Sequence, residues 1–279
     1  MSAVEKLLDS MRLKNSLVCC GLDPDLSKFP FEILNSSASN QVLGFLCTVV
    51  DITIPHVCAY KIQKAFFDIF DDGHSILCEI VNYIRKVDPS IYISLDCKIG
   101  DIDNTMKVYL ANMFDIIGVD GVVINPYMGQ EVFEPFLKDY SQKSGIVLVK
   151  TSNPGASKIQ DLKLWNNQLL WEEILFKMVS EWNGASNLIP VLASTHLIGT
   201  NGIRSVIPDQ MPILYAGFGA QGGSLVEFSS LLNSEQSGVF VNSSRGLLYP
   251  YNSEDTNWRE SILSAVTAMK QQLNQVRGV

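Results

Sequence analysis

The sequence predicts an α/β fold, a (β/α)8 TIM barrel. Eight short apolar runs of strand character alternate with amphipathic helical stretches along 279 residues. No linker of biased composition and no internal repeat interrupts this alternation, so we expect a single domain over residues 1–279. Polar and glycine-rich segments follow most of the apolar runs, which is where a barrel carries its functional groups. A doubly wound open sheet fits the same alternation and remains the alternative.

The expected strands are short apolar runs rich in Val, Ile and Leu. In chain order they are "SLVCCGL" (16–22), "HVCAYKI" (56–62), "IYISLD" (91–96), "GVVIN" (121–125), "GIVLVKT" (145–151), "LIPVLAS" (188–194), "PILYAG" (212–217) and "GVFVN" (238–242).

Amphipathic helices are expected between these strands and at both ends of the chain. The expected ranges are 41–54, 74–86, 104–117, 161–182, 224–233 and, as the last helix, 254–276. The opening "MSAVEKLLDSMRLKN" predicts an extra N-terminal helix with charges of both signs. It has no apolar region like that of a signal peptide, and no apolar stretch of the sequence is long enough to span a bilayer. We therefore expect a cytoplasmic protein with no membrane partner.

The overall charge is acidic, with a net charge of −8 and a pI near 4.9. This balance argues against nucleic acid as a partner, although a local group of basic residues can still bind a small anion. The six cysteines form no C-x-x-C pair, which indicates reduced structural thiols. The three histidines form no H-E-x-x-H pattern, so we expect no metal site.

The stretch "SLDCKIGDIDNT" (94–105) places two carboxylates around one lysine at the end of an apolar strand. Strand alternation puts Asp96 and Lys98 on one face and turns Cys97 toward the helix layer. Helical spacing in "GDIDNTMKVYLANMF" puts Asp101 and Thr105 on one side of the first turn of the next helix. These charges converge either on a functional site or on a salt-bridged helix start, and spacing alone leaves both open.

Other polar groups gather at the same predicted rim of the barrel. Lys61 ends an apolar strand and could pair with the carboxylates of the neighbouring strand. The loops after the last two strands, "GFGAQGG" (217–223) and "NSSRG" (242–246), contain Gln221 and Arg245 and favour a phosphate site over ordinary glycine turns. "TSNPG" (151–155) offers hydroxyl groups to a polar ligand or is only a helix-entry turn.

Seven motifs in order, from about residue 16 to about residue 250, resemble those of the orotidine 5′-monophosphate decarboxylases. They are "GLDPD", "YKIQKAFF", "LDCKIGDIDNT", "NPYMG", "KTSNPG", "GFGAQGG" and "NSSRG". The longer form of that family, found in some bacteria and in apicomplexan parasites, is the most similar. The resemblance implies a homodimeric barrel that converts orotidine 5′-monophosphate (OMP) to uridine 5′-monophosphate (UMP) and CO₂, in UMP biosynthesis, without metal or organic cofactor.

The resemblance also implies a role for each matching residue. The charged tetrad of the family matches Lys61, Asp96, Lys98 and Asp101. Lys98 would protonate C6 of the pyrimidine as CO₂ leaves, Asp96 would lie against the departing carboxylate, and Asp101 would enter the site from the partner subunit.

Five further positions match the nucleotide contacts of the family. Asp23 matches a ribose-hydroxyl contact and Thr105 a ribose contact made from the partner subunit. Ser152 matches the contact to the pyrimidine edge. Gln221 and Arg245 match the phosphate contacts.

Some positions depart from the family pattern. Ile99 and Asp103 stand where bacterial relatives often have Arg and Gly, Ala216 replaces a common proline, and "LASTH" (192–196) replaces the usual Gly-Ala-Thr. None of these belongs to the tetrad. Two alternatives stay open: a Mg²⁺-dependent sugar-phosphate decarboxylase or aldolase of the same superfamily, and a non-catalytic nucleotide-binding barrel. Lys61 argues against the first, since those relatives have an acidic residue there, and the complete tetrad argues against the second.

Overall fold

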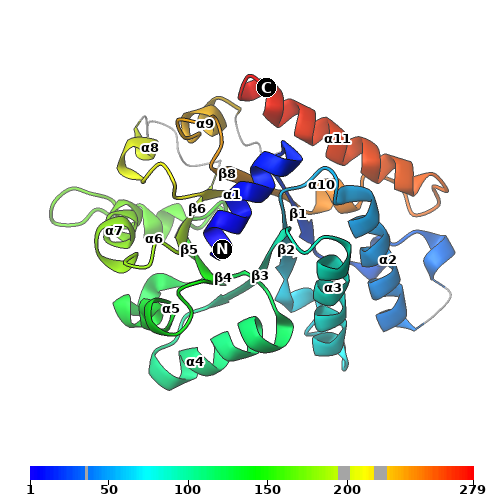
Figure 1. Cartoon of the computed structure of the whole chain (residues 1–279), viewed down its shortest axis with the longest axis horizontal. Helices are drawn as coiled ribbons and strands as arrows, with labels where there is room; N and C mark the ends of the chain where they lie inside the picture. The colour runs from blue at the N-terminus through cyan, green and yellow to red at the C-terminus, as the bar shows by residue number, and fades with distance from the viewer. Residues whose placement is uncertain (35–36, 194–201, 217–224) are drawn as a thin grey trace.

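The computed structural model describes residues 1–34, 37–193, 202–216 and 225–279. Its centre is a closed barrel of eight parallel strands in chain order, with β8 paired back onto β1 (Figure 1). The strands are β1 (Val18–Leu22), β2 (Ala59–Gln63), β3 (Tyr92–Ile99), β4 (Gly121–Ile124), β5 (Ser144–Lys150), β6 (Leu188–Ala193), β7 (Ile213–Ala216) and β8 (Val239–Ser243). The predicted TIM barrel is confirmed, and the open sheet is excluded because β1 and β8 are hydrogen-bonded neighbours.

Helices surround this barrel. They are α1 (Ala3–Lys14), α2 (Ala38–Thr53), α3 (Gly73–Val87), α4 (Asp103–Ala111), α5 (Glu134–Lys138), α6 (Ser157–Gln160), α7 (Leu170–Lys177), α8 (Ile203–Val206), α9 (Leu225–Ser230), α10 (Arg245–Leu248) and α11 (Trp258–Val276). Wider π-helical turns extend α4 over Asn112–Ile117 and α7 over Met178–Trp182. No helix in the described part of the chain is long and apolar enough to cross a membrane.

The prediction of one helix over 161–182 was wrong. The chain leaves α6 at Gln160 and resumes a helix only at Leu170. Between them it turns back on itself through an antiparallel bridge from Lys163 to Leu169, with Asn167 in a left-handed conformation (φ 64°). Asparagine adopts this conformation more readily than most residues, which favours a turn over a continued helix.

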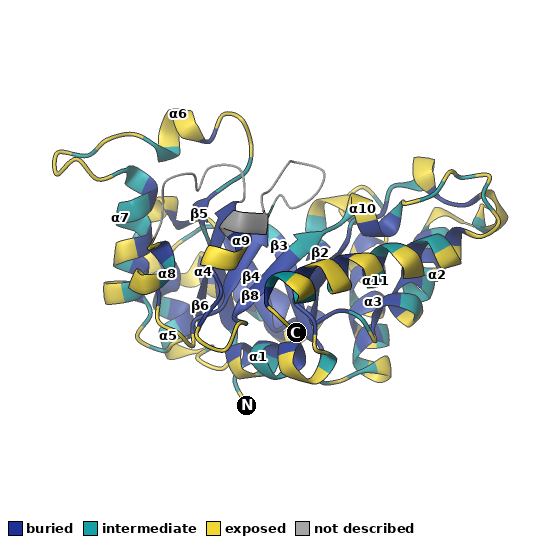
Figure 2. Ribbon diagram, turned by 90° about the horizontal axis from the view of Figure 1, so that it is seen from above, coloured by how far each residue is buried: buried dark blue, intermediate teal, exposed yellow. Residues whose placement is uncertain are grey.

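The extra N-terminal helix is confirmed, and it covers the end of the barrel opposite α6 (Figure 2). Ser2 and Glu5 form a capping box that starts α1. Lys6 on α1 forms an ion pair with the buried Asp120 at 3.2 Å, and Arg85 on α3 pairs with the same carboxylate at 2.5 Å. These charged contacts join α1 and α3 at this end of the barrel, which leaves the opposite end for ligands.

Toward the amino ends of the strands, the interior of the barrel is packed with large side chains. The Tyr92 and Phe240 rings meet edge to face with centroids 6.2 Å apart, and the Tyr92 hydroxyl lies 2.7 Å from Oγ of Ser144. Gly121 makes room for this ring, because a Cβ there would lie 2.1 Å from the Tyr92 hydroxyl oxygen. Asp96 lies on the same face of β3 as Tyr92, further toward the carboxyl end, so the polar site lies above a filled core.

Candidate active site

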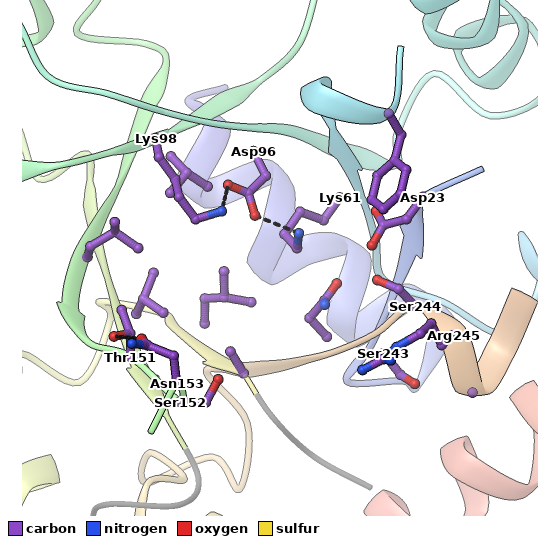
Figure 3. A pocket seen from close by; sticks show the side chains of 18 of the residues that line it. Asp23, Lys61, Asp96, Lys98, Thr151, Ser152, Asn153, Ser243, Ser244 and Arg245 are labelled. Carbon is purple, nitrogen blue, oxygen red and sulfur yellow. Dashed lines mark hydrogen bonds and ion pairs between the residues drawn. The ribbon is translucent and has the colours of Figure 1, made fainter. Parts of the chain in front are cut away.

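A pocket of about 420 Å³ opens at the carboxyl ends of the strands. Its walls come from most strands of the barrel and from the loops that follow them (Figure 3). The polar and charged residues that line it are Asp23, Asp25, Lys28, Lys61, Asp96, Lys98, Thr151, Ser152, Asn153, Asn242, Ser243, Ser244, Arg245 and Tyr249. Polar residues at the carboxyl ends of the strands, where the sequence predicts a functional rim, therefore line a concave pocket.

Three charged side chains form a row along one wall of the pocket (Figure 3). Nζ of Lys61 lies 2.8 Å from Oδ2 of Asp96, and Nζ of Lys98 lies 2.6 Å from Oδ1 of the same carboxylate. The side chains of Lys61 and Asp96 are only 9% and 10% exposed, whereas that of Lys98 is 50% exposed. Asp96 therefore joins one buried and one accessible ammonium group.

The protonation states of the buried pair follow from this arrangement. Burial raises the pKa of Asp96, but the nearby ammonium groups of Lys61 and Lys98 outweigh it, so the pKa lies below its usual value. Burial lowers the pKa of Lys61, but the carboxylates of Asp96 and Asp23 outweigh it, so the pKa lies above its usual value. Both groups are thus charged at neutral pH.

The backbone at Lys98 departs from regular strand geometry. Lys98 has a left-handed conformation (φ 46°), and the register of β3 against β4 shifts between Leu95 and Ile99. A left-handed conformation is unfavourable for a non-glycine residue by about 1–2 kcal/mol, and such residues gather at functional sites. Cys97, the residue before, contacts Sδ of Met113 in the helix layer at 3.6 Å, as strand alternation predicted.

A second wall is built where β8 ends and α10 begins, by Ser243, Ser244 and Arg245 (Figure 3). β8 lies against β1, and Gly21 lets Ser244 approach, since a Cβ at Gly21 would lie 1.9 Å from Oγ of Ser244. Arg245 begins α10, is exposed and lines the pocket. Gln221, which the sequence predicts to form a phosphate site together with Arg245, lies outside the described residues.

Asp23 follows β1 and lies between the charged row and the Arg245 wall (Figure 3). Its buried Oδ1 has no hydrogen-bond partner among the described residues, so it is free to accept from a ligand. The Tyr249 hydroxyl holds the loop in place: it accepts from the Asp25 amide at 2.7 Å and donates to the Asp23 carbonyl at 3.1 Å.

Sequence reasoning missed several lining residues, among them Lys28, Asn153, Asn242 and Tyr249. Asn242 could have been found, because it immediately follows the buried Val241 of β8 and belongs to a motif already singled out. Tyr249 had no local signal, since it reaches the pocket from a segment beyond α10.

The structure does not bring Asp101 and Thr105 into this pocket. The prediction that Asp101 lies in the first helical turn was wrong, because α4 begins at Asp103 and Asp101 precedes it. Oδ1 of Asp101 accepts from the amide of Ile102 at 2.8 Å, and Thr105 is exposed on α4. Within the described chain, the row of charges therefore has three members, Lys61, Asp96 and Lys98, rather than four.

The departures from the family pattern have local explanations where the structure describes them. Asp103 has φ 48°, a conformation that glycine adopts freely and that aspartate tolerates better than most residues. Ile99 pairs with Ile124 of β4 and packs against the core instead of facing the pocket. Ala216 ends β7 and lines the pocket. In 192–196 only Leu192 and Ala193, at the end of β6, are described.

Among the described residues, no group of three or more His, Cys, Asp or Glu side chains could hold a metal ion. Asp96 already contacts two ammonium groups. A divalent cation beside this carboxylate would be repelled by both lysines, so these residues do not fit a Mg²⁺ site.

Comparisons with known proteins agree on one family. Residues 16–223 match the Orotidine 5'-phosphate decarboxylase / HUMPS family. A curated Orotidine 5'-phosphate decarboxylase from Cellvibrio japonicus is 34% identical over 278 residues, covering 99% of this chain and 100% of that protein. Another from Christiangramia forsetii is 34% identical over 270 residues, covering 96% of each. A solved structure of Leishmania donovani OMP decarboxylase has a TM-score of 0.82 at 26% identity and covers 100% of both chains.

Proposed function

This chain belongs to the orotidine 5'-phosphate decarboxylase / HUMPS family, and we propose that the pocket described above is where it decarboxylates OMP. The reaction converts OMP to UMP and CO₂ in pyrimidine biosynthesis and makes the chain a carbon–carbon lyase. The observation that carries the proposal is the row of Lys98, Asp96 and Lys61 in the pocket, with an accessible ammonium held by a buried, ionised carboxylate.

The chemistry needs a fixed positive charge beside the reacting carbon. When the bond from C6 to the carboxylate breaks, CO₂ leaves and the electron pair stays on C6, where the ring delocalises it poorly. The Lys98 ammonium stabilises this charge because Asp96 holds it in place before the reaction begins. Lys98 then donates a proton to C6 and regains one from solvent, which completes the exchange of CO₂ for hydrogen.

Asp96 and Lys61 keep this ammonium oriented. The buried Lys61 donates to Oδ2 of Asp96, and its positive charge keeps this carboxylate ionised. The other oxygen, Oδ1, accepts from Lys98. We propose that the same negative charge lies against the substrate carboxylate and repels it until CO₂ departs.

The rest of the nucleotide would extend across the pocket. Arg245, with its forked guanidinium, suits the phosphate, and Gln221 is proposed as a second phosphate contact. Asp23, with its unpartnered Oδ1, suits a ribose hydroxyl, and Ser152 on the opposite wall suits the pyrimidine edge. Phosphate binding far from C6 then supplies binding energy for assembling the site.

The direct test is turnover of OMP by the purified chain and by a Lys98→Ala variant. The variant should fold normally, because half of the Lys98 side chain is exposed, and should lose decarboxylation. Normal turnover by the variant would remove the proposed proton donor. We propose that the reaction needs no metal or organic cofactor, so EDTA should leave the rate unchanged.

We further propose that the chain forms a homodimer in which Asp101 and Thr105 complete the partner's site. Neither residue lines the pocket of its own chain. Thr105 lies on α4 near the exposed Val108, and Ile116 is exposed in the π-helical turns that extend α4; Val108 and Ile116 are 70% and 63% exposed. Tyr127, after β4, is 90% exposed. Large exposed apolar side chains of this kind suit a contact with a second copy.

Mixing two inactive variants, Lys98→Ala and Asp101→Ala, tests this arrangement. A heterodimer would have one site with both changes and one intact site. Random pairing makes about half of the dimers heterodimers, so about a quarter of wild-type activity should return under two-fold symmetry. Heterodimers that form, shown by co-purification of different tags, yet stay inactive would rule out a role for Asp101 in the partner's site.

We also propose that the whole chain is one barrel domain that works in the cytoplasm. The first and last strands of the barrel come from opposite ends of the sequence, so the sheet closes only when residues 18–243 fold together. All six cysteines are free thiols, in keeping with a reducing compartment.

A further inference from the structure

The loop after β5 contributes Thr151, Ser152 and Asn153 to the pocket and is held from outside by Gln160 at the end of α6. The Thr151 amide donates to Oε1 of Gln160 at 3.0 Å, and Nε2 of Gln160 donates to Oγ1 of Thr151 at 2.8 Å. Oγ1 of Thr151 in turn donates to Oδ1 of Asn153 at 2.7 Å. One side chain thus fixes both the backbone and the side chain of the residue that precedes Ser152.

Lys150 ties the same loop to the barrel. It is the last residue of β5, is fully buried, and donates from Nζ to Oδ1 of Asp161, the residue after α6. Strand alternation from Leu148, which lines the pocket, would direct Lys150 into the pocket as well. The register of β5 against β6 shifts between these two residues, and Lys150 does not line the pocket.

A buried ammonium group needs a partner of opposite charge, because its desolvation is otherwise uncompensated. The pair with Asp161 therefore holds the far end of α6 at one place on the barrel. Since Gln160 is the neighbour of Asp161, the two residues attach α6 to Lys150 and Thr151 at consecutive positions. Residues 152–159, which include Ser152, lie between these two attachment points, so this segment is restrained at both of its ends.

We propose that Lys150, Gln160 and Asp161 form a clamp that positions Ser152 against the pyrimidine ring of the nucleotide. None of the three lines the pocket, so they are positioning residues that act through the loop. The proposal rests on the proposed function, in which Ser152 contacts the pyrimidine edge. It adds a group outside the pocket that determines recognition of the base, separately from recognition of the phosphate by Arg245.

The clamp can be opened from two sides. Gln160→Ala removes both hydrogen bonds to Thr151, and since Gln160 is half-buried at the end of a short helix, the barrel should remain folded. Asp161→Ala leaves the buried Lys150 without its partner. Each change should weaken UMP binding about tenfold, the factor expected for one lost hydrogen bond to a positioned group. Binding of ribose 5-phosphate, which has no base, should change by less than about twofold.

Calorimetric titration of the full-length protein with UMP provides the test, with ribose 5-phosphate measured by displacement of UMP. The variants are Gln160→Ala, Asp161→Ala and Ser152→Ala, together with the two double variants that combine each clamp change with Ser152→Ala. The matched control is Asp9→Ala, which breaks an exposed ion pair to Arg12 on α1, at the other end of the barrel. This control should bind both ligands like the wild type.

The double variants decide whether the clamp acts through Ser152. In the Ser152→Ala background, the clamp changes should have less than about a twofold further effect on UMP binding. Losses that add in full, or equal losses for UMP and ribose 5-phosphate, overturn the clamp while leaving the Ser152 contact intact. A Ser152→Ala variant that binds UMP as tightly as the wild type overturns the pyrimidine contact and the clamp together. Turnover of OMP by the wild type reports on the proposed function independently of all these results.

Discussion

Replacing Lys61 by methionine should destabilise the barrel, because Lys61 neutralises a buried carboxylate. Its Nζ lies 2.8 Å from Oδ2 of Asp96, and both side chains are about nine-tenths buried. Methionine has a similar length and fills the same space without a charge. Of the ion pairs that Asp96 forms within the described residues, the one to Lys98 would remain, and the side chain of Lys98 is half exposed.

The expected loss follows from the cost of leaving one buried charge unpaired, about 3–5 kcal/mol. Because Lys98 remains 2.6 Å from the other carboxylate oxygen, we expect the lower end of this range, about 3 kcal/mol. A chain of 279 residues has an unfolding entropy of about 0.6 kcal/mol/K. The melting temperature should therefore fall by about 5 °C.

The penalty should depend on pH in a defined direction. In the wild type the pKa of Asp96 is lowered from 3.8, so its contribution to stability is present above that value and is lost as the pH falls through the folded-state pKa. Without Lys61, the ammonium of Lys98 is left to oppose the effect of burial, which raises the pKa of Asp96. The pKa of Asp96 in the folded variant is therefore higher than in the wild type. The variant then accepts a proton on Asp96 more readily than the wild type, and the difference in stability should shrink between pH 7 and about pH 4.

Urea unfolding of the wild type and of Lys61→Met at both pH values measures this difference. Lys64→Met is the matched control, since Lys64 follows β2 directly and pairs with the exposed Asp68; it should change stability little. A second replacement, Asp96→Asn, should recover most of the loss caused by Lys61→Met. The reasoning fails if the penalty is the same at both pH values, or if Asp96→Asn adds its full cost to that of Lys61→Met.

Two further predictions concern the nucleotide and the backbone. Arg245→Ala should weaken UMP binding by about 10- to 100-fold, the range for a charge-assisted hydrogen bond, and leave uridine binding unchanged in the same titration. Equal losses for both ligands would show that Arg245 does not hold the phosphate. At position 103, whose φ is 48°, Asp103→Val should lower the free energy of unfolding by about 1–2 kcal/mol, whereas Asp103→Gly should be tolerated. Equal stability of these two variants in urea unfolding would argue against a left-handed backbone there.

Much of the fold could be predicted from the sequence, because the signals involved are local. All eight strands lie within three residues of their predicted bounds, since short apolar runs between turn residues mark buried parallel strands whatever their neighbours are. The same period of two placed Asp96 and Lys98 on one face of β3 and Cys97 on the other. The position of a pocket at the carboxyl ends of the strands could also be predicted, because barrels of this kind carry their sites at that end.

Other features were decided only by contacts between distant segments. The position of Lys150 depends on a register shift between β5 and β6, which no periodicity within β5 reveals. Tyr249 fixes the Asp23 loop by hydrogen bonds across more than two hundred residues of sequence, and the start of α4 after Asp101 depends on the backbone path out of β3. Periodicity reports which face of an element a residue occupies. Which partner that residue meets, and whether its charge is buried beside another, is set by the packing of strands and loops that are far apart in the chain.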